Sequence, residues 1–383
     1  MKKTQLYIGL MSGTSADGID LALVDFSEQQ PQLIASYYQA YEQSVHDKIT
    51  LLYNPSDNEI ERAFSLDIEL AHLFTNAINE FLFQQHLTSQ DIIAIGNHGQ
   101  TIRHKPNQKN AFTLQIGCNQ TLASLTDIIV IGQFRRKDMA LGGQGAPLVP
   151  AFHHVMFNEP EQDVFVVNLG GIANISYLPN IHSLNNNNTI IGYDTGPGNA
   201  LMDDWFVANK KDHHSTKHYD EHGNWANNGK VNKPLLSSFL SDKFFTLIAP
   251  KSTGREYFHL TWLYEHLNKR DIAKLNLSNQ DIQATLSLLT AKTIANEIKK
   301  LSSTAKVYLC GGGIHNKTLK NKLIQELTNY EILLTNHKDI DADSLEAMAF
   351  AWMAFAYNKK IFSNIPAVTG ACKKAVLGTA FYP

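Results

Sequence analysis

The stretch that decides the fold is Tyr7-Ile8-Gly9-Leu10-Met11-Ser12-Gly13-Thr14-Ser15-Ala16-Asp17-Gly18-Ile19-Asp20. A short apolar run enters a loop of Gly, Ser and Thr, and a second apolar run, residues 21–26, leaves it. This pattern predicts two strands joined by a glycine turn. Glycines let the backbone approach a ligand closely, and several hydroxyl and N–H groups in one turn suit an anion such as a phosphate. The alternative is an ordinary β-hairpin with a polar turn.

The same pattern recurs later in the chain. Residues 164–177 again read as strand, glycine turn and strand, with Gly170-Gly171 at the turn, about 160 residues after the first loop. A third cluster, Gly311-Gly312-Gly313, follows an apolar run and suits a flat group such as a nucleoside. Each cluster alone reads as a tight turn, but three in this order favour ligand binding. The first loop lacks a Gly-Lys-Ser/Thr ending and precedes a strand, which excludes a Walker A loop and a dinucleotide fingerprint. Two similar hairpins therefore predict two related domains around a cleft, as in the actin-like and sugar-kinase class of ATPases.

Strand-like and helix-like patterns alternate along the rest of the chain, which predicts an α/β architecture. We expect long helices over 58–86, 282–301 and 345–356, and a short buried strand over 92–95. One apolar face of the first long helix is expected to contain Ile60, Phe64, Ile68, Ala71, Phe74, Ile78 and Leu82. The asparagine run at 185–188 is expected at a loop tip, and residues 210–233 are expected to be exposed and irregular.

Composition bounds the class of protein. The chain has 383 residues, of which 43% are hydrophobic and 18% charged, and this is typical of a globular protein with two or three domains. Its net charge of −3 gives no reason to expect nucleic acid or an anionic membrane as a partner. No apolar run reaches the roughly 18 residues of a membrane span, and Gly9 cuts the first apolar run too short for a signal peptide. Three distant cysteines, Cys118, Cys310 and Cys372, are interpreted as reduced thiols of a cytoplasmic protein.

Three sets of acidic residues are candidates for chemistry. Asp194 follows a short apolar run at 189–191 and opens a Gly-Pro-Gly turn before an expected helix from Ala200, so it suits a base at a strand end. Alternatively, it caps that turn or helix. Glu346 lies early in the third long helix, where the helix macrodipole alone also favours an acidic residue. Asp17 and Asp20 flank the first loop and suit either Mg²⁺ or the turn itself.

The basic candidates are less specific. Arg135 and Arg136 precede a further glycine-rich stretch at residues 142–145. An arginine binds a carboxylate or phosphate with two parallel hydrogen bonds. Most arginines are simply solvated, so this assignment needs further support. His213, His214 and His218 lie in a polar stretch without the spacing of a metal site, so we assign no metal to them.

Taken together, the motifs resemble the anhydro-N-acetylmuramic acid kinase family. The resemblance runs in unbroken order from Gly9 to about Leu377. The matching strings are residues 9–20, His98-Gly99-Gln100-Thr101, Phe134-Arg135-Arg136, 142–150, 168–174, Asp194-Thr195-Gly196-Pro197-Gly198-Asn199, Lys251-Ser252-Thr253-Gly254-Arg255-Glu256, Cys310-Gly311-Gly312-Gly313 and Thr369-Gly370-Ala371.

The resemblance implies a two-domain ATPase with a ribonuclease H-like fold that acts in bacterial cell-wall recycling. Such enzymes use ATP, Mg²⁺ and water to convert 1,6-anhydro-N-acetylmuramic acid to N-acetylmuramic acid 6-phosphate. Asp194 would be the base that activates the water, with Glu346 as a second acidic group. Gln100, Thr101 and Arg135 would contact the sugar and its lactyl carboxylate. The residues implied to bind ATP are Ser12, Gly13, Thr14, Ser15, Ala16, Asp17, Gly18, Ile19, Gly170, Gly171, Gly311, Gly312 and Gly313.

We expect a first domain of residues 1–133 with about 372–383, and a second domain of residues 134–371. The metal ligands are not assigned, and a homodimer is left open. The chain departs from the family pattern at Gln133 and Cys118, where an aspartate is expected, and a carboxylate lost beside Arg135 would remove a partner that orients it. Two alternatives remain open. One is a conventional sugar kinase of the same fold, in which Asp194 deprotonates a free hydroxyl, and the other is an actin-like module that only changes shape with nucleotide.

Overall fold

A computed structural model describes residues 4–182, 189–210, 217–249, 251–338 and 340–383. The chain divides into two compact units, residues 1–156 with 339–383 and residues 157–338. The expected loop tip at 185–188 and two of the candidate histidines, His213 and His214, lie outside the described residues.

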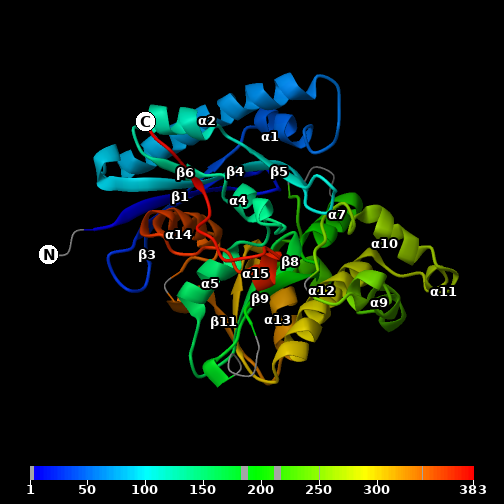
Figure 1. The fold of residues 1–383 in the computed structure, drawn as a ribbon. Helices are drawn as coiled ribbons and strands as arrows, with labels where there is room; N and C mark the ends of the chain where they lie inside the picture. Colours follow the sequence, from blue (N-terminus) through cyan, green and yellow to red (C-terminus); the bar gives the residue numbers. More distant parts are fainter. Residues whose placement is uncertain (1–3, 183–188, 211–216, 250, 339) are drawn as a thin grey trace. The chain divides into compact units, whose positions relative to one another are not determined.

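The first unit is built on a seven-stranded sheet, with the order β12-β6-β4-β1-β2-β3 and β5 paired to β4 (Figure 1). Its strands are β1 (Leu6–Ser12), β2 (Gly18–Asp25), β3 (Gln32–Ala40), β4 (Ile92–Lys105), β5 (Phe112–Ile116), β6 (Val130–Gly132) and β12 (Thr379–Phe381). Strands β1, β2 and β3 form an antiparallel meander, whereas β4 runs parallel to β1 and β6 parallel to β4. The predicted hairpin around the first loop is therefore confirmed.

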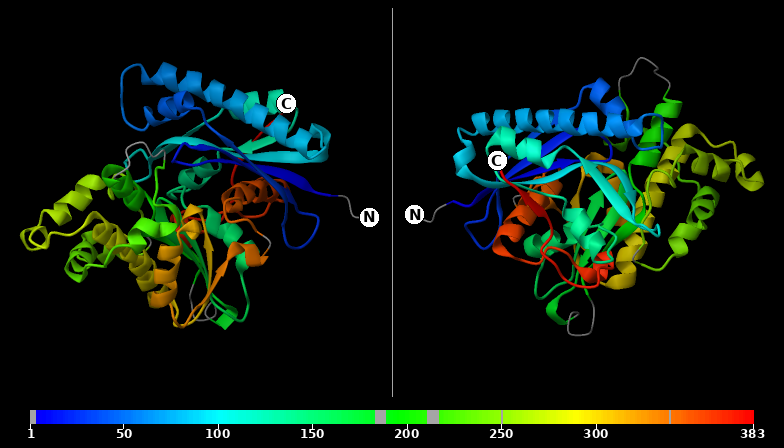
Figure 2. Two further views of the ribbon diagram at one scale, coloured as in Figure 1. Left: turned by 180° about the vertical axis from the view of Figure 1, so that it is seen from behind. Right: turned by 45° about the horizontal axis from the view of Figure 1, so that its top comes forward.

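Helices cover both faces of this sheet. The longest, α2, lies along one face and α14 along the other, as Figures 1 and 2 show. The helices of the unit are α1 (Gln43–Thr50), α2 (Glu59–Gln84), α3 (Asn119–Thr126), α4 (Phe134–Ala140), α5 (Val149–Phe157), α14 (Leu345–Lys359) and α15 (Pro366–Thr369), with a 3₁₀ turn η1 (Ser89–Asp91). Glycines allow the close approach of α14, because a Cβ at Gly9 or Gly96 would overlap the carbonyl oxygen of Ala347 or Phe350.

The second unit repeats the strand order of the first. Its five-stranded sheet has the order β11-β10-β7-β8-β9, with β7, β8 and β9 antiparallel and β10 and β11 parallel to β7. The strands are β7 (Val164–Leu169), β8 (Ile172–Leu178), β9 (Ile191–Pro197), β10 (Lys306–Cys310) and β11 (Glu331–Leu334). In both units a three-stranded meander is followed by two parallel strands beyond its first strand. This repeat confirms the predicted α/β fold of two related domains of the ribonuclease H-like, actin-like class.

The helices of the second unit confirm the long helix expected over 282–301. They are α7 (Ala200–Asn209), α8 (Asn224–Asn227), α9 (Lys233–Leu240), α10 (Leu260–Leu267), α11 (Arg270–Ala273), α12 (Asn279–Leu301) and α13 (Lys317–Glu326). The 3₁₀ turns are η2 (Glu221–Gly223), η3 (Lys243–Thr246), η4 (Gly312–His315) and η5 (Thr335–Lys338). Ser278 caps α12 through a reciprocal pair of hydrogen bonds with Asp281, and α12 packs against β8 and β9.

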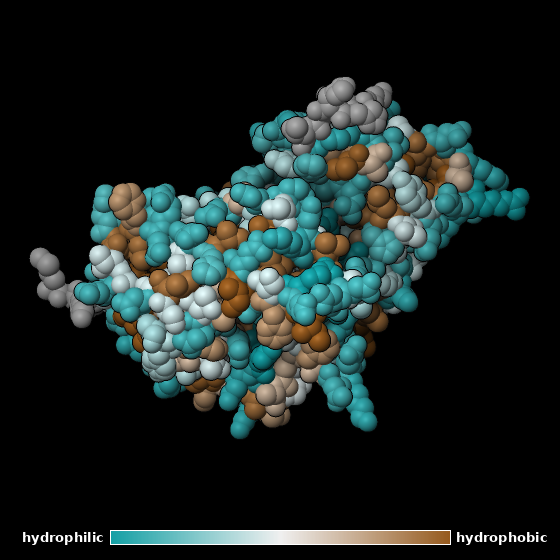
Figure 3. Space-filling model, turned by 90° about the horizontal axis from the view of Figure 1, so that it is seen from above, coloured by the Kyte–Doolittle hydropathy of each residue, from teal (hydrophilic) through white to brown (hydrophobic). Residues whose placement is uncertain are grey.

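The predicted apolar face of α2 is wrong in its first half. Ile60, Phe64 and Ile68 are exposed by 75%, 70% and 42%, and the buried row begins instead with Ala63, Leu66 and Leu70. A spacing of four residues turns a row about 40° around the helix at each step, so this row winds off the buried side. Figure 3, which looks onto the molecule from above, shows brown apolar residues interspersed with teal polar ones.

Three other expectations need correction. Strand β4 does not end at residue 95 but continues to Lys105, because β5 pairs with its second half. Asp194 lies within β9 and not after a strand. The stretch 210–233 is not simply irregular, because its described part contains η2 and α8. The buried carboxylate of Asp220 joins these two elements by accepting hydrogen bonds from the N–H groups of Trp225 and Ala226.

The compact units divide the chain at positions that differ from the expected domain boundaries. Residues 134–156 and 339–371 belong to the first unit, although we expected them in the second domain. The physical reason is that α14 packs on β1, β2 and β4. No disulfide bond joins the three cysteines, all of which lie within the described residues. Within the described ranges, no helix combines the length and the apolar character that a membrane crossing requires.

Replacing Gly96 with alanine tests the close contact between β4 and α14. The new Cβ overlaps a backbone carbonyl that cannot rotate away, so we expect Gly96→Ala to lower the free energy of unfolding by about 3 kcal/mol in urea titration. Gly13→Ala is the control, because its Cβ meets only the hydroxyl of Ser15 at 3.6 Å. Equal stabilities of the two variants would contradict this account of the packing.

Candidate active site

The first loop is held from beneath by two buried side chains. The Ser12 hydroxyl donates to Oε1 of Gln100 at 2.6 Å and lies 3.0 Å from the carbonyl oxygen of Gly18. Nε2 of Gln100 donates in turn to the carbonyl oxygen of Gly13 at 3.0 Å. Both side chains are 0% exposed. The structure therefore places Ser12 and Gln100 as supports of the loop, and the expected contact of Gln100 with a sugar stays a prediction.

The upper part of the same loop is presented to solvent. Thr14, Ser15 and Asp17 are exposed and Gly13 is partly so, whereas Ala16, Gly18 and Ile19 are buried. Two tyrosine hydroxyls bind the loop backbone, that of Tyr53 at the Thr14 carbonyl (2.8 Å) and that of Tyr38 at the Asp17 carbonyl (3.1 Å). The loop is thus a tethered turn with exposed hydroxyls at its tip, as an anion cradle requires.

Carboxylates gather beside this loop within the first unit. Burial raises the pKa of Asp20 to about 7, and the negative charges of Asp17, Glu346, Asp343 and Asp341 raise it further in the same direction. The structure thus brings Glu346, in the first turn of α14, into the electrostatic neighbourhood of Asp20. Among the described residues, no three His, Cys, Asp or Glu side chains are arranged to enclose a metal ion.

Arg135, at the start of α4, is oriented by an uncharged histidine. Its Nε donates to Nε2 of His98 at 3.0 Å, and its Nη1 donates to the Gly145 carbonyl at 2.8 Å. Nδ1 of His98 lies 2.7 Å from the Gly99 carbonyl, so that ring nitrogen carries the proton. Burial and the charge of Arg135 hold the pKa of His98 well below its ordinary value. Burial also lowers the pKa of Arg135 to about 10, against the opposing charges of Glu346 and Asp138.

The two positions at which we expected an aspartate, Gln133 and Cys118, both lie at helix starts. Gln133 precedes α4 with a left-handed φ of 59°, and Cys118 precedes α3. Gln133 lines a cavity of about 30 Å³ together with His98 and Arg136. Arg135 takes its orientation from His98 and Gly145, so these two groups do the work that we expected of a neighbouring carboxylate. Thr101, the remaining predicted sugar contact, accepts a hydrogen bond from Gln115 at 3.1 Å.

Asp194 lies in the second unit, on the edge strand β9. Its Oδ2 accepts hydrogen bonds from the N–H of Thr253 at 2.9 Å and the hydroxyl of Ser252 at 3.1 Å. Its own N–H donates to the Lys251 carbonyl at 3.0 Å. Burial raises the pKa of Asp194 to about 6, the bonds from Thr253 and Ser252 oppose this, and the charge of Glu256 adds to it. A carboxylate with a pKa near neutrality and one oxygen already fixed suits proton transfer through the other oxygen.

A bulge aims this carboxylate. The register of β8 and β9 shifts between Ala173 and Asn174, which pair with Gly196 and Asp194, so Thr195 is an extra residue. The Thr195 hydroxyl, which is buried, donates to the Ala173 carbonyl at 3.1 Å. Bulges beside functional sites commonly redirect one side chain of a strand. The pairing also sets Asp194 opposite Asn174, whose side chain shares its face of the sheet.

The glycine clusters of the second unit meet at one edge of its sheet. Gly170-Gly171 follow β7 and Gly311 follows β10, and these strands are parallel neighbours. A Cβ at Gly313 would press on Leu169, whereas a Cβ at Gly312 would meet nothing within 4 Å. The carboxyl ends of parallel strands are where open α/β sheets bind ligands. The structure therefore brings together the two turns that the sequence analysis assigned to nucleotide.

The groups that hold Asp194 were not predicted from the sequence. Ser252 and Thr253 belong to a quoted motif, but nothing in their spacing showed that they would bind Asp194, 58 and 59 positions away. Glu297 lies within α12 and has no local sequence signal for a role beside Asp194. His218 is exposed and belongs to no described cluster of metal ligands.

Comparison with known proteins gives full-length matches. The family model for anhydro-N-acetylmuramic acid kinase matches residues 5–383. An anhydro-N-acetylmuramic acid kinase of Colwellia psychrerythraea is 56% identical, over 98% of this chain and 97% of its own. One of Shewanella denitrificans is 46% identical, over 99% and 98%. The activator of 2-hydroxyisocaproyl-CoA dehydratase from Clostridium difficile, solved with bound ADPNP, is 14% identical over 93% of this chain and 96% of its own, with a TM-score of 0.45.

Removing the Ser252 hydroxyl tests the electrostatics of Asp194. The hydroxyl stabilises the carboxylate, so we expect Ser252→Ala to raise the pKa of Asp194 by up to about one unit. Carboxyl-carbon NMR titration would measure it. Ser241→Ala is the control, because that hydroxyl binds the Ser238 carbonyl. An unchanged or lower pKa in Ser252→Ala would refute the assigned hydrogen bond.

Proposed function

This chain belongs to the anhydro-N-acetylmuramic acid kinase family, and we propose from that premise that it converts 1,6-anhydro-N-acetylmuramic acid, ATP and water to N-acetylmuramic acid 6-phosphate and ADP. The observation that carries the mechanism is the half-buried Asp194 carboxylate, fixed through Oδ2 by Thr253 and Ser252. The reaction would serve peptidoglycan recycling. Three cysteines outside any disulfide bond and the need for ATP favour the cytoplasm as its place.

Asp194 acts as the general base in this proposal. It accepts a proton from the water whose oxygen attacks the anomeric carbon, and the bond from that carbon to the bridging 6-oxygen breaks. The 6-oxygen then bonds to the γ-phosphorus as the bond to the ADP oxygen breaks. Glu346 is the second acidic group, which assists in holding the water. A positioned base of suitable pKa contributes about 10² to 10⁴ in rate.

ATP would be held by the glycine turns. The exposed tip of the first loop, Thr14 and Ser15, suits the phosphates, and Gly170-Gly171 supply a second turn at the carboxyl end of β7. Gly311 to Gly313 would lie beside the adenosine, where the open space around Gly312 supports the assignment. The remaining loop residues, from Ser12 to Ile19, fix the shape of the cradle.

Mg²⁺ fits the carboxylates beside the first loop. Magnesium is commonly bound by one or two carboxylates, with water and phosphate oxygens completing its shell, so an enclosing protein cage is not required. Asp17 and Asp20 offer such oxygens, and the crowding of negative charge around Asp20 favours a cation there. When bound, the ion supplies charge neutralisation for the transferring phosphoryl group.

The sugar's lactyl carboxylate would be bound by Arg135. Its Nε donates to His98 and its Nη1 to the Gly145 carbonyl. Because the guanidinium group is planar, these two contacts also fix the direction of Nη2. Thr101 and Gln100 lie on β4, whose register with β1 sets Gln100 opposite Ser12. We propose that Thr101 contacts the sugar while Gln100 acts mainly through the loop.

Asp194→Asn tests the base. It keeps the shape and the Thr253 contact but cannot take a proton, so we expect kcat to fall about 10²- to 10⁴-fold with the KM for ATP within about twofold of wild type. Asp163→Asn is the matched control, since Asp163 also accepts two hydrogen bonds, from Tyr177 and Asn180, just before β7. Near-wild-type turnover by Asp194→Asn would sink the assignment.

Isotope labelling distinguishes hydrolytic opening from a conventional sugar kinase. In ¹⁸O-water, the proposed reaction places label on the anomeric hydroxyl in step with phosphorylation. The label must be read at early times, because a free anomeric hydroxyl exchanges with water. Phosphorylated product without early label would favour phosphoryl transfer to a free hydroxyl. Nucleotide binding without any phosphorylated sugar would favour the switching module.

The pH dependence follows from the raised pKa of Asp194. The base works only when ionised, so kcat should fall as pH drops through about 6, by about tenfold for each further unit. Initial rates at saturating substrate between about pH 5 and about pH 8 would show this limb. A rate that stays flat through pH 6 is incompatible with Asp194 as the base.

A further inference from the structure

Glu297, on α12, is a buried carboxylate that the proposed mechanism does not use. Its Oε2 accepts a hydrogen bond from the Tyr193 hydroxyl at 3.1 Å, and its Oε1 accepts one from Nζ of Lys251 at 2.9 Å. Lys300 also donates to Oε1, at 2.9 Å. Burial alone would raise the pKa of Glu297, but Lys251 and Lys300 hold it below its ordinary value, so the group is ionised.

The pair that Glu297 makes with Lys251 is almost completely buried. The two side chains are only 7% and 2% exposed. Removing two charges from water costs about as much as their attraction returns, so a buried ion pair contributes little net stability. Such a pair does enforce geometry, because leaving either partner alone is strongly unfavourable. The ion pair of Glu297 and Lys251 is therefore expected to act by holding neighbouring segments of the chain in place.

Two of the three groups that donate to Glu297, Tyr193 and Lys251, are each next in sequence to a residue that takes part in the Asp194 contact. Tyr193 immediately precedes Asp194 on β9, and Lys251 immediately precedes Ser252 and Thr253. The Lys251 carbonyl also accepts the N–H of Asp194 at 3.0 Å. Because β9 is an edge strand paired only with β8 among the described strands, that bond ties it to the segment 251–253, and α12 packs against it as well. One carboxylate thus joins the strand that carries Asp194 to the segment that binds its side chain.

We propose that Glu297 is a positioning residue for Asp194, acting through Tyr193 on one side and Lys251 on the other. This inference rests on the proposed role of Asp194 as the base. The described hydrogen bonds of Glu297 go to Tyr193, Lys251 and Lys300, and none of them goes to Asp194. It sets the separation between β9 and the segment 251–253, and so the two hydrogen bonds that fix Oδ2 of Asp194.

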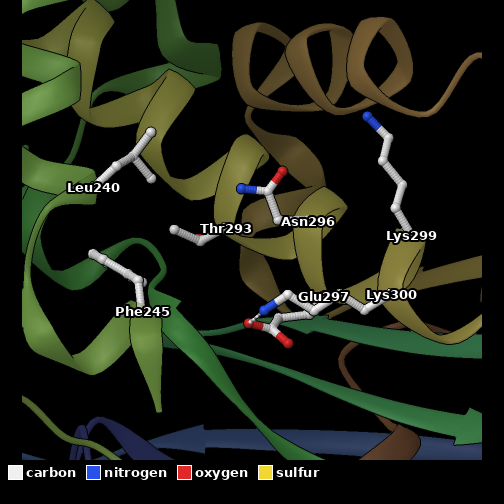
Figure 4. A pocket seen from close by; sticks show the side chains of 7 residues that line it. All are labelled: Leu240, Phe245, Thr293, Asn296, Glu297, Lys299 and Lys300. Carbon is white, nitrogen blue, oxygen red and sulfur yellow. Dashed lines mark hydrogen bonds and ion pairs between the residues drawn. The ribbon is translucent and has the colours of Figure 1, made fainter. Parts of the chain in front are cut away.

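Lys300, which lines a pocket together with Glu297, provides a matched control. The cavity, of about 450 Å³, is lined by Leu240, Phe245, Thr293, Asn296, Glu297, Lys299 and Lys300. Figure 4 shows the Lys300 side chain turned towards Glu297 from the same helix. Lys300 is 55% exposed and touches neither Tyr193 nor Lys251 in the described contacts. Lys300→Met therefore removes one partner of Glu297 and leaves both ties to Asp194.

Glu297→Gln tests the proposal in the full-length enzyme. The variant keeps the size of the side chain but loses the charge that holds Lys251. We expect kcat to fall about 10- to 100-fold through misplacement of the base, with the KM for ATP within about twofold of wild type. The weakened bonds from Thr253 and Ser252 should also move the acid limb of kcat to higher pH. Glu256 is the charged group described near Asp194, and it is unchanged in the variant.

Lys300→Met should keep kcat within about twofold of wild type and leave the acid limb in place. Tyr193→Phe removes only one tie and should lower kcat roughly 3- to 10-fold in a folded protein. This milder variant also decides the matter if Glu297→Gln does not fold. The proposal is overturned if Glu297→Gln or Tyr193→Phe folds with wild-type kcat and limb, or if Lys300→Met is as impaired as Glu297→Gln.

Failure of this inference is distinguishable from failure of the proposed function. If Asp194→Asn retains turnover, the base is wrong and the positioning role falls with it. If Asp194→Asn is inactive while Glu297→Gln behaves as wild type, the base stands and only the positioning role is overturned.

Discussion

The absence of side chains at Gly9 and Gly96 is the constraint on which the first unit depends. Two central strands, β1 and β4, meet the backbone of α14 directly because neither glycine carries a Cβ. This contact attaches a late segment of the chain to the N-terminal sheet. It also brings Glu346, at the start of α14, near Asp20 and Arg135. The packing of α14 on β1 and β4 therefore also brings these charged groups together.

The second unit reaches a similar result by different means. Its sheet has the same strand order, but its acidic residue lies within the edge strand itself. A bulge and three hydrogen bonds to the segment 251–253 orient Asp194. Burial raises the pKa of the aspartate, and these contacts fix its direction. A carboxylate at the tip of a free loop would have neither property, because water would surround it.

Much of the fold was readable from the sequence because local patterns carried it. Both glycine hairpins, the long helices α12 and α14 and the repeat itself have strong periodic or turn signals. The row Ile60, Phe64 and Ile68 failed because its spacing drifts around α2 and nothing local shows which side faces the sheet. The domain boundaries could not be read because they depend on where α14 packs.

Residues of the candidate site could be proposed from the sequence only where a motif contains them. Asp194 and the glycine turns stood out, but the supports of the site come from distant positions. Gln100 beneath the first loop, His98 beside Arg135 and Glu297 behind Asp194 are each joined to their partners by tertiary contacts. Their side chains are buried. A motif contains His98 and Gln100, but a single sequence has no signal for which residue a buried polar group supports.

The edge position of β9 has one more consequence. Exposed strand edges invite pairing with other chains, and folded proteins commonly block them with loops or prolines. Here the Lys251 carbonyl accepts the N–H of Asp194 in the middle of β9. The strand ends at Pro197, which has no N–H. The arrangement that prepares a carboxylate for chemistry therefore also guards the protein against aggregation through that edge.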